Sequence, residues 1–203
     1  MNALRKAAAA SIPLTVLLCF TYGHFHQVKI STPHEATKEQ IVQKIIQHME
    51  NESVSFEDEA LWSSAEIIYE ESRQKRIDYR LVLAVMKVES NFQHDAVSNR
   101  GARGLLQLMP SVAKFIAKDA GIQWHGVKTL DEPTKNIKIG IHHLSSLLDD
   151  FESLNLALHA YHVGPTRLKE ILSEQHKPDK KFLNLVLKEY KNNKASLPEP
   201  NLL

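Results

Sequence analysis

The chain has 203 residues, 43% of them hydrophobic and 24% charged, and its formal net charge is +1. This length suits one domain, and the near-neutral charge argues against a protein that binds nucleic acid by neutralising its phosphates. With seven glycines, eight prolines and one cysteine (Cys19), the chain has too few turn residues for a many-stranded all-β fold, and it has neither an internal disulfide framework nor a cysteine-based zinc finger.

The first part of the chain has the layout of an export segment. Arg5 and Lys6 precede an apolar run, and residues 7–28 contain no Lys, Arg, Asp or Glu. A basic start followed by an apolar run is typical of a signal peptide or a short membrane anchor, with the basic residues on the cytoplasmic side. We therefore expect residues 1–28 to direct the rest of the chain across a membrane, cleaved or uncleaved, and residues 29–36 to form a tether.

From Thr37 onward, apolar residues recur at the three- and four-residue spacing of amphipathic helices, and strand signals are weak. The acidic segment 50–71 has no Lys or Arg, and we expect its charged side to be solvated. Expected helices begin at Thr37, within 50–71, after Asp78, at Pro110, near Asp131–Pro133, at Leu154 and at Lys181, with a short turn at Thr166. We predict an all-α fold, a compact helical bundle over residues 37–194, followed by a flexible tail over 195–203.

Glu89 is the residue that points most directly to chemistry. It ends an unusually apolar helical segment, and at about 100° per residue it lies within roughly 40° of Val82 and Val85 on the hydrophobic face. A carboxylate in that position is either paired, with Arg100 or Arg103, or has a raised pKa because burial penalises its charged form. A raised pKa suits a general acid that works near neutral pH. Periodicity alone leaves both interpretations open.

Three blocks that start at Glu89 share their order and spacing with a known family. They are Glu89-Ser90-x-Phe92 with Ala96-Val97-Ser98, Gly101-Ala102 and Gly104-Leu105-Leu106-Gln107-Leu108-Met109-Pro110; Leu130-Asp131-x-Pro133-x-x-Asn136-Ile137-x-x-Gly140; and Ala157-x-x-Ala160-Tyr161-x-x-Gly164-Pro165. Over about residues 77–167, the chain resembles the soluble lytic transglycosylase (SLT-type) family, which shares the goose-type lysozyme fold. The resemblance implies a lysozyme-like helical domain with a catalytic cleft.

The resemblance also implies roles for the matching residues. Glu89 aligns with the family's sole catalytic acid and base, while Ser98, Gln107, Met109 and Tyr161 align with residues around the sugar at the cleaved bond. The implied reaction cleaves the β-1,4 bond between N-acetylmuramic acid and N-acetylglucosamine and leaves a 1,6-anhydro end. The implied partner is a peptidoglycan glycan strand at the periplasmic side of a bacterial cell envelope. No cofactor, metal or nucleic acid is implied, and protein partners are unknown.

His162 is the most consequential departure from the family, which usually has Asn at this position. We count His162 among the substrate-binding residues, because an imidazole can still donate a hydrogen bond, although it is bulkier and titrates near pH 6–7. His159 and His162 have the i,i+3 spacing of metal ligands. Solvated or core histidines explain them better, and no metal site is expected.

No convincing second carboxylate accompanies Glu89. Asp95 is better explained by turn formation and Asp131 by helix capping, which favours transglycosylation over hydrolysis. Two other functions stay open. One is a hydrolysing, lysozyme-like muramidase. The other is a weakly active or inactive peptidoglycan-binding protein of an envelope assembly, for which His162 and the charged flanks are the motivation.

Overall fold

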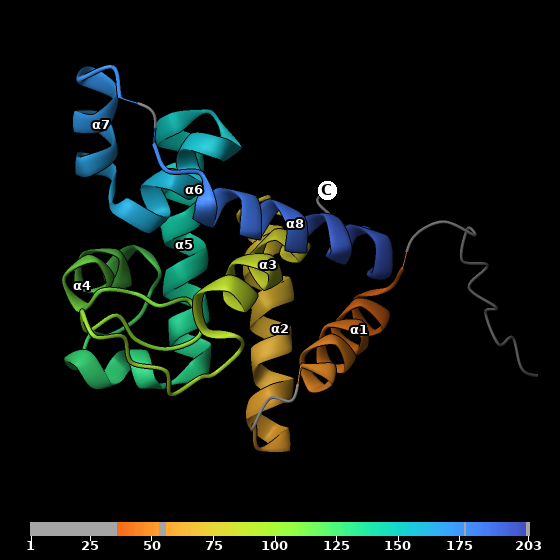
Figure 1. Cartoon of the computed structure of the whole chain (residues 1–203). Helices are drawn as coiled ribbons and strands as arrows, with labels where there is room; N and C mark the ends of the chain where they lie inside the picture. The colour runs from red at the N-terminus through yellow and green to blue at the C-terminus, as the bar shows by residue number, and fades with distance from the viewer. Residues whose placement is uncertain (1–35, 53–55, 177, 202–203) are drawn as a thin grey trace, which may run out of the picture. The chain divides into compact units, whose positions relative to one another are not determined.

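The computed structural model describes residues 36–52, 56–176 and 178–201. Within this part of the chain there are eight α-helices, one 3-10 helix and no strand beyond isolated bridges in one loop (Figure 1). The predicted all-α fold is confirmed. The expected export segment (1–28) and nearly all of the tether lie outside the described residues. None of the described helices is long and apolar enough to span a membrane.

The helices follow the predicted order closely. They are α1 (Lys38–Asn51), α2 (Asp58–Gln74), α3 (Tyr79–Ser90), α4 (Pro110–Asp119), the 3-10 helix η1 (Val127–Asp131), α5 (Pro133–Phe151), α6 (Leu154–Val163), α7 (Pro165–Ser173) and α8 (Lys181–Ser196). The short turn expected at Thr166 is wrong: this segment is the helix α7, which starts at Pro165, a residue suited to the first helical turn. The expected capping by Asp131 is also wrong: the N-cap residue of α5 is Glu132, no side chain caps this helix, and Asp131 Oδ1 accepts a hydrogen bond from Arg103 Nε at 2.7 Å.

Helix α3 lies at the centre of the core. Its residues 81–86 are at most 4% exposed, and α8 and α2 pack against it (Figure 1). Asp78 caps α3 as predicted, accepting from the backbone N–H of Arg80 at 2.9 Å. From α8, Tyr190 Oη donates to Asp78 at 2.8 Å and Asn193 Nδ2 donates to the Arg80 carbonyl at 2.9 Å. The helix that carries the candidate acid is therefore fixed by both packing and polar contacts.

Helices α2 and α5 pack together through an ion pair that the acidic pattern of α2 did not predict. Glu71 is 5% exposed and accepts from Lys138 Nζ at 2.9 Å and from His142 Nε2 at 3.1 Å. An unpaired buried carboxylate would be strongly destabilising, and the two α5 side chains offset that cost. Glu71 thus departs from the expected solvated acidic side.

The segment expected to form a tail begins inside α8, which ends only at Ser196. Beyond it, the Tyr79 hydroxyl donates to the Pro198 carbonyl at 2.7 Å, and Asn201 Nδ2 donates to the Ala36 carbonyl at 2.9 Å. The described part of this segment therefore contacts the beginning of α3 and the residues before α1.

Candidate active site

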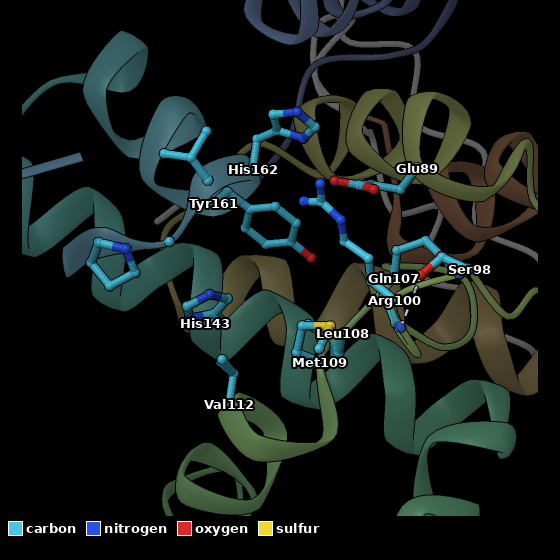
Figure 2. A pocket seen from close by; sticks show the side chains of 14 residues that line it. Glu89, Ser98, Arg100, Gln107, Leu108, Met109, Val112, His143, Tyr161 and His162 are labelled. Atoms are coloured by element: carbon cyan, nitrogen blue, oxygen red, sulfur yellow. Dashed lines mark hydrogen bonds between the residues drawn. The ribbon is translucent and has the colours of Figure 1, made fainter. Parts of the chain in front are cut away.

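A cavity of about 400 Å³ opens beside the C-terminal end of α3 (Figure 2). Its walls come from α3, the loop that follows it, helices α4, α5 and α6, and the first residue of α7. All six site residues that we expected from the sequence line this cavity: Glu89, Ser98, Gln107, Met109, Tyr161 and His162. The fold thus brings together side chains that are up to 73 positions apart in the chain (162 − 89).

Glu89 is the sole carboxylate among the residues that line the cavity. Its side chain is half-buried, and burial raises its pKa to about 7. Within the described residues it has no hydrogen-bond or ion-pair partner. Arg103, one of the two partners considered from the sequence, instead pairs with Asp131 at 2.7 Å. At neutral pH a substantial fraction of the Glu89 carboxyl groups is therefore protonated and able to donate a proton.

The loop after α3 is tied to the helix immediately behind the acid. The backbone turns into the left-handed region at Asn91 and Phe92, with φ of 52° and 61°. The Phe92 side chain is fully buried, and the buried Ser90 hydroxyl donates to the Leu105 carbonyl at 2.8 Å. Burial of Phe92 and the bond from Ser90 support this uncommon backbone conformation. They also fix the direction in which the loop leaves Glu89.

Two of the expected substrate-binding side chains also shape the loop. Ser98 Oγ accepts from the Ala102 N–H at 3.0 Å. Gln107 Nε2 donates to the carbonyls of Ala96 at 3.1 Å and Gly104 at 2.9 Å. The amide oxygen of Gln107 has no partner in the described part of the chain and is available to accept a hydrogen bond at the cavity.

The side chain of Asn136 in α5 holds this loop and η1 through three hydrogen bonds. It is completely buried, and its Oδ1 accepts from the Leu106 N–H at 2.9 Å, while its Nδ2 donates to the carbonyls of Arg103 at 2.9 Å and Leu130 at 3.1 Å. A Cβ on Gly104 would lie 2.8 Å from the Leu130 carbonyl oxygen, and φ at this glycine is +73°. Glycine is therefore required where the loop approaches η1.

The opposite wall of the cavity is aromatic. The Tyr161 hydroxyl donates to the Leu106 carbonyl at 2.7 Å, and the His143 ring lies 5.3 Å from the Tyr161 ring. His162 stacks on Phe182 of α8, with ring centroids 4.4 Å apart. Burial lowers the pKa of His143 to about 4 and also lowers the pKa of His162. Both imidazoles are therefore mainly neutral near pH 7.

Several candidates considered from the sequence lie away from the cavity lining: Asp95, Asp131 and His159. Asp95 is exposed, whereas His159 is 4% exposed. In the part of the chain that the structure describes, no three His, Cys, Asp or Glu side chains are grouped so that they could hold a metal ion.

Arg100 and His143 line the cavity but were absent from the expected set. Arg100 lies between Ser98 and the Gly101-Ala102 pair of the first block. The sequence indicated Arg100 only as a candidate ion-pair partner of Glu89. The folded loop instead shows it as an unpaired residue of the cavity lining.

Comparison with known proteins matches the chain to a family. Residues 66–184, more than half of the chain, match the family model "Transglycosylase SLT domain". A transglycosylase of Enterobacteria phage PRD1 is 35% identical over 116 residues, which are 57% of this chain and 40% of that protein. A soluble lytic murein transglycosylase of Salmonella typhimurium is 33% identical over 100 residues, 48% of this chain and 16% of that protein. The chain thus spans less than half the length of these relatives.

Solved structures agree with these matches. A crystal structure of an inactive glutamate-to-glutamine mutant of the lytic transglycosylase Slt from Pseudomonas aeruginosa is 28% identical with a TM-score of 0.56, covering 66% of this chain and 24% of that one. The 70 kDa soluble lytic transglycosylase of Escherichia coli, 18% identical with a TM-score of 0.52, covers 77% of this chain and 28% of that one and shares the fold. The chain belongs to the transglycosylase SLT domain family.

Proposed function

We propose that this chain is a peptidoglycan lytic transglycosylase that cleaves the β-1,4 bond between N-acetylmuramic acid and N-acetylglucosamine at the periplasmic side of a bacterial envelope. The observation that carries this proposal is a single carboxyl group with a pKa of about 7 in a cavity that no other carboxylate lines. Family membership and the inactive glutamate-to-glutamine mutant of the Pseudomonas relative support it.

In the proposed reaction, Glu89 acts twice. Its protonated carboxyl group first gives its proton to the glycosidic oxygen, and the bond from the anomeric carbon to that oxygen breaks. The resulting carboxylate then removes the proton of the muramoyl 6-hydroxyl, whose oxygen attacks the anomeric carbon and closes the 1,6-anhydro ring. Glu89 ends the cycle protonated. Because the nucleophile belongs to the substrate, one carboxyl group is enough, whereas most hydrolytic glycosidases need two.

The other lining residues are assigned to substrate positioning. Gln107 offers its free amide oxygen as an acceptor, and Ser98 offers a hydroxyl in the same loop. Met109 is 40% exposed and provides an apolar surface for a sugar face. His162 takes the place of the family asparagine as a neutral donor, and Tyr161 holds the Leu106 carbonyl so that the loop keeps its shape.

Product analysis tests the proposal directly. Purified sacculi are digested with the full chain in ¹⁸O-labelled water, and the released muropeptides are identified by mass spectrometry. We expect products lighter than the hydrolysis products by one water molecule and free of label. Reducing ends that carry ¹⁸O would instead identify a hydrolysing muramidase, and the absence of any released product would contradict both enzymatic functions.

The pH dependence of cleavage follows from the pKa of Glu89. The acid must be protonated when it meets the substrate, so kcat/KM is maintained below the pKa and falls as pH rises through about 7. Well above that pH the fall approaches about tenfold per pH unit. Initial rates on soluble glycan strands, with circular dichroism of the same samples as the folding control, measure the profile. A rate that stays flat across this range would contradict Glu89 as the proton donor.

His162 distinguishes an active enzyme from a binding protein. Its ring is held by Phe182 and is neutral near pH 7, so it can donate a hydrogen bond as an asparagine amide does. We expect His162→Asn to change kcat/KM by less than about tenfold and His162→Ala to lower it by about tenfold, the scale of one hydrogen bond. A rise from near-zero turnover in His162→Asn, with sacculus binding unchanged, would favour the weakly active binding protein instead.

A further inference from the structure

Arg100 lines the cavity and carries a charge, but it has no role in the proposed reaction. It lies in the loop after α3 and lines the same cavity as Glu89 and Tyr161 (Figure 2). Burial lowers the pKa of His162, the charge of Asp179 raises it and the charge of Arg100 lowers it, so both charged side chains are within electrostatic reach of His162. Arg100 therefore contributes a charge to the wall of the substrate cavity.

Within the described residues, the Arg100 side chain has no hydrogen-bond or ion-pair partner, in contrast to Arg103 and Arg80. Arg103 pairs with Asp131 at 2.7 Å, and Arg80 pairs with Asp78 at 2.8 Å. A guanidinium group presents a planar fork of donors that matches a carboxylate. The guanidinium group of Arg100 binds no other described side chain at the cavity. It therefore has no role in holding the loop in place.

Arg100 is also the sole permanent cation among the lining residues. His143 and His162 are the other basic side chains there, and burial keeps both mainly neutral near pH 7. Burial is the cause of the raised pKa of Glu89. When Glu89 is protonated, as its acid role requires, the residues that line the cavity carry one positive charge, that of the exposed Arg100 side chain. Such a site favours an anionic group on the ligand.

We propose that Arg100 binds a carboxylate carried by the muramoyl residue and so selects glycan strands with a free negative charge beside the scissile bond. This inference rests on the proposed function. The sugar backbone of peptidoglycan is uncharged apart from the lactyl group of N-acetylmuramic acid. That carboxylate is free in peptide-free strands, whereas in peptide-bearing strands the carboxylates belong to the attached peptide.

Matched substrates separate these sources. The full chain is assayed on peptide-free strands, on the same strands with their lactyl carboxylates converted to neutral amides, and on uncross-linked peptide-bearing strands. The variants are Arg100→Gln, Arg100→Lys and, as the matched control, Arg103→Gln, which removes one charge from the same loop outside the cavity. Calorimetric binding of the three strands in the Glu89→Gln background gives a readout independent of cleavage.

We expect the wild-type KM to be about fivefold lower for the free-carboxylate strands than for the amidated strands, as one charge-assisted hydrogen-bonded pair would give. Arg100→Gln should remove this difference with kcat nearly unchanged, Arg100→Lys should keep part of it, and Arg103→Gln should keep it in full. An Arg100 effect confined to peptide-bearing strands would identify the peptide as the source of the carboxylate.

Two results would overturn the inference. One is an Arg100→Gln variant with the same preference for charged strands as the wild type. The other is a fall in kcat on the amidated strands, which would mean that Arg100 acts on Glu89 and not on the substrate. Failure of the wild type to cleave any strand would instead contradict the proposed function, and the calorimetric comparison would still decide whether Arg100 recognises a carboxylate.

Discussion

Glu89→Gln is expected to lower glycan cleavage by about a thousandfold or more, because one residue supplies both the acid and the base of the proposed reaction. Glutamine has nearly the same size and shape, so the half-buried position tolerates it, but its amide can neither give a proton to the glycosidic oxygen nor remove one from the muramoyl 6-hydroxyl. Release of anhydro-muropeptides from sacculi, followed by mass spectrometry, measures the loss.

Although Glu89→Gln should lower activity, it should raise the stability of the fold at high pH. The pKa of Glu89 is about 7 in the folded chain against an ordinary value of 4.5. Because the folded value is raised, the contribution of Glu89 to stability is fully present below pH 4.5 and is lost as pH rises through about 7. Glutamine does not titrate, so Glu89→Gln should gain about 1–3 kcal/mol on the wild type between these limits, the side chain being partly open to the cavity.

These two readouts separate chemistry from misfolding. Denaturant unfolding at about pH 5 and about pH 8 gives the stability difference, and an inactive variant that is more stable than the wild type at the higher pH has kept its fold. Asp95→Asn is the matched control, because Asp95 is exposed and lies outside the cavity lining. Its cleavage rate should match the wild type. Unchanged cleavage by Glu89→Gln would remove the basis of the proposed mechanism.

The features of the site that could be predicted are those that depend on residues close together in the sequence. The apolar face of α3 placed Glu89 toward the interior, Asp78 marked the beginning of that helix and Pro110 marked the beginning of α4. The family motifs then indicated which loop side chains would meet the acid. These signals depend on neighbours within one helical turn or on a fixed spacing. They can therefore be recognised without knowledge of the tertiary packing.

The part that could not be predicted depends on contacts between distant segments. Nothing near Asp131 in the sequence shows that Arg103, 28 positions earlier, binds it in preference to a helix end. The stacking of His162 on Phe182 requires α8 to cross α6. Such partners are chosen by tertiary packing, which overrides the local preference of an aspartate for a helix N-terminus or of a histidine for solvent.

Asn136 is the strongest example of such a hidden role, and its replacement should be the most damaging to the fold. Asn136→Ala leaves the Leu106 N–H and the carbonyls of Arg103 and Leu130 without their partner in a fully buried position. Unsatisfied buried groups cost about 1–3 kcal/mol each, so we expect a loss of about 3–5 kcal/mol in the free energy of unfolding. Denaturant titration measures this loss.

Because the same three bonds hold the loop that carries Gln107, the damage should reach the active site before the chain unfolds. At temperatures where Asn136→Ala is still folded, we expect kcat/KM to fall by about tenfold or more, since small displacements of positioning groups are costly to catalysis. Asn136→Asp keeps the acceptor for the Leu106 N–H but faces two carbonyls with an oxygen, so its destabilisation should grow as pH rises and the carboxylate ionises. Lys135→Ala, next to it on α5 but in a partly exposed ion pair with Glu132, should cost less than about 1 kcal/mol. Equal losses at both positions would show that α5 itself, and not the Asn136 bonds, supports the loop.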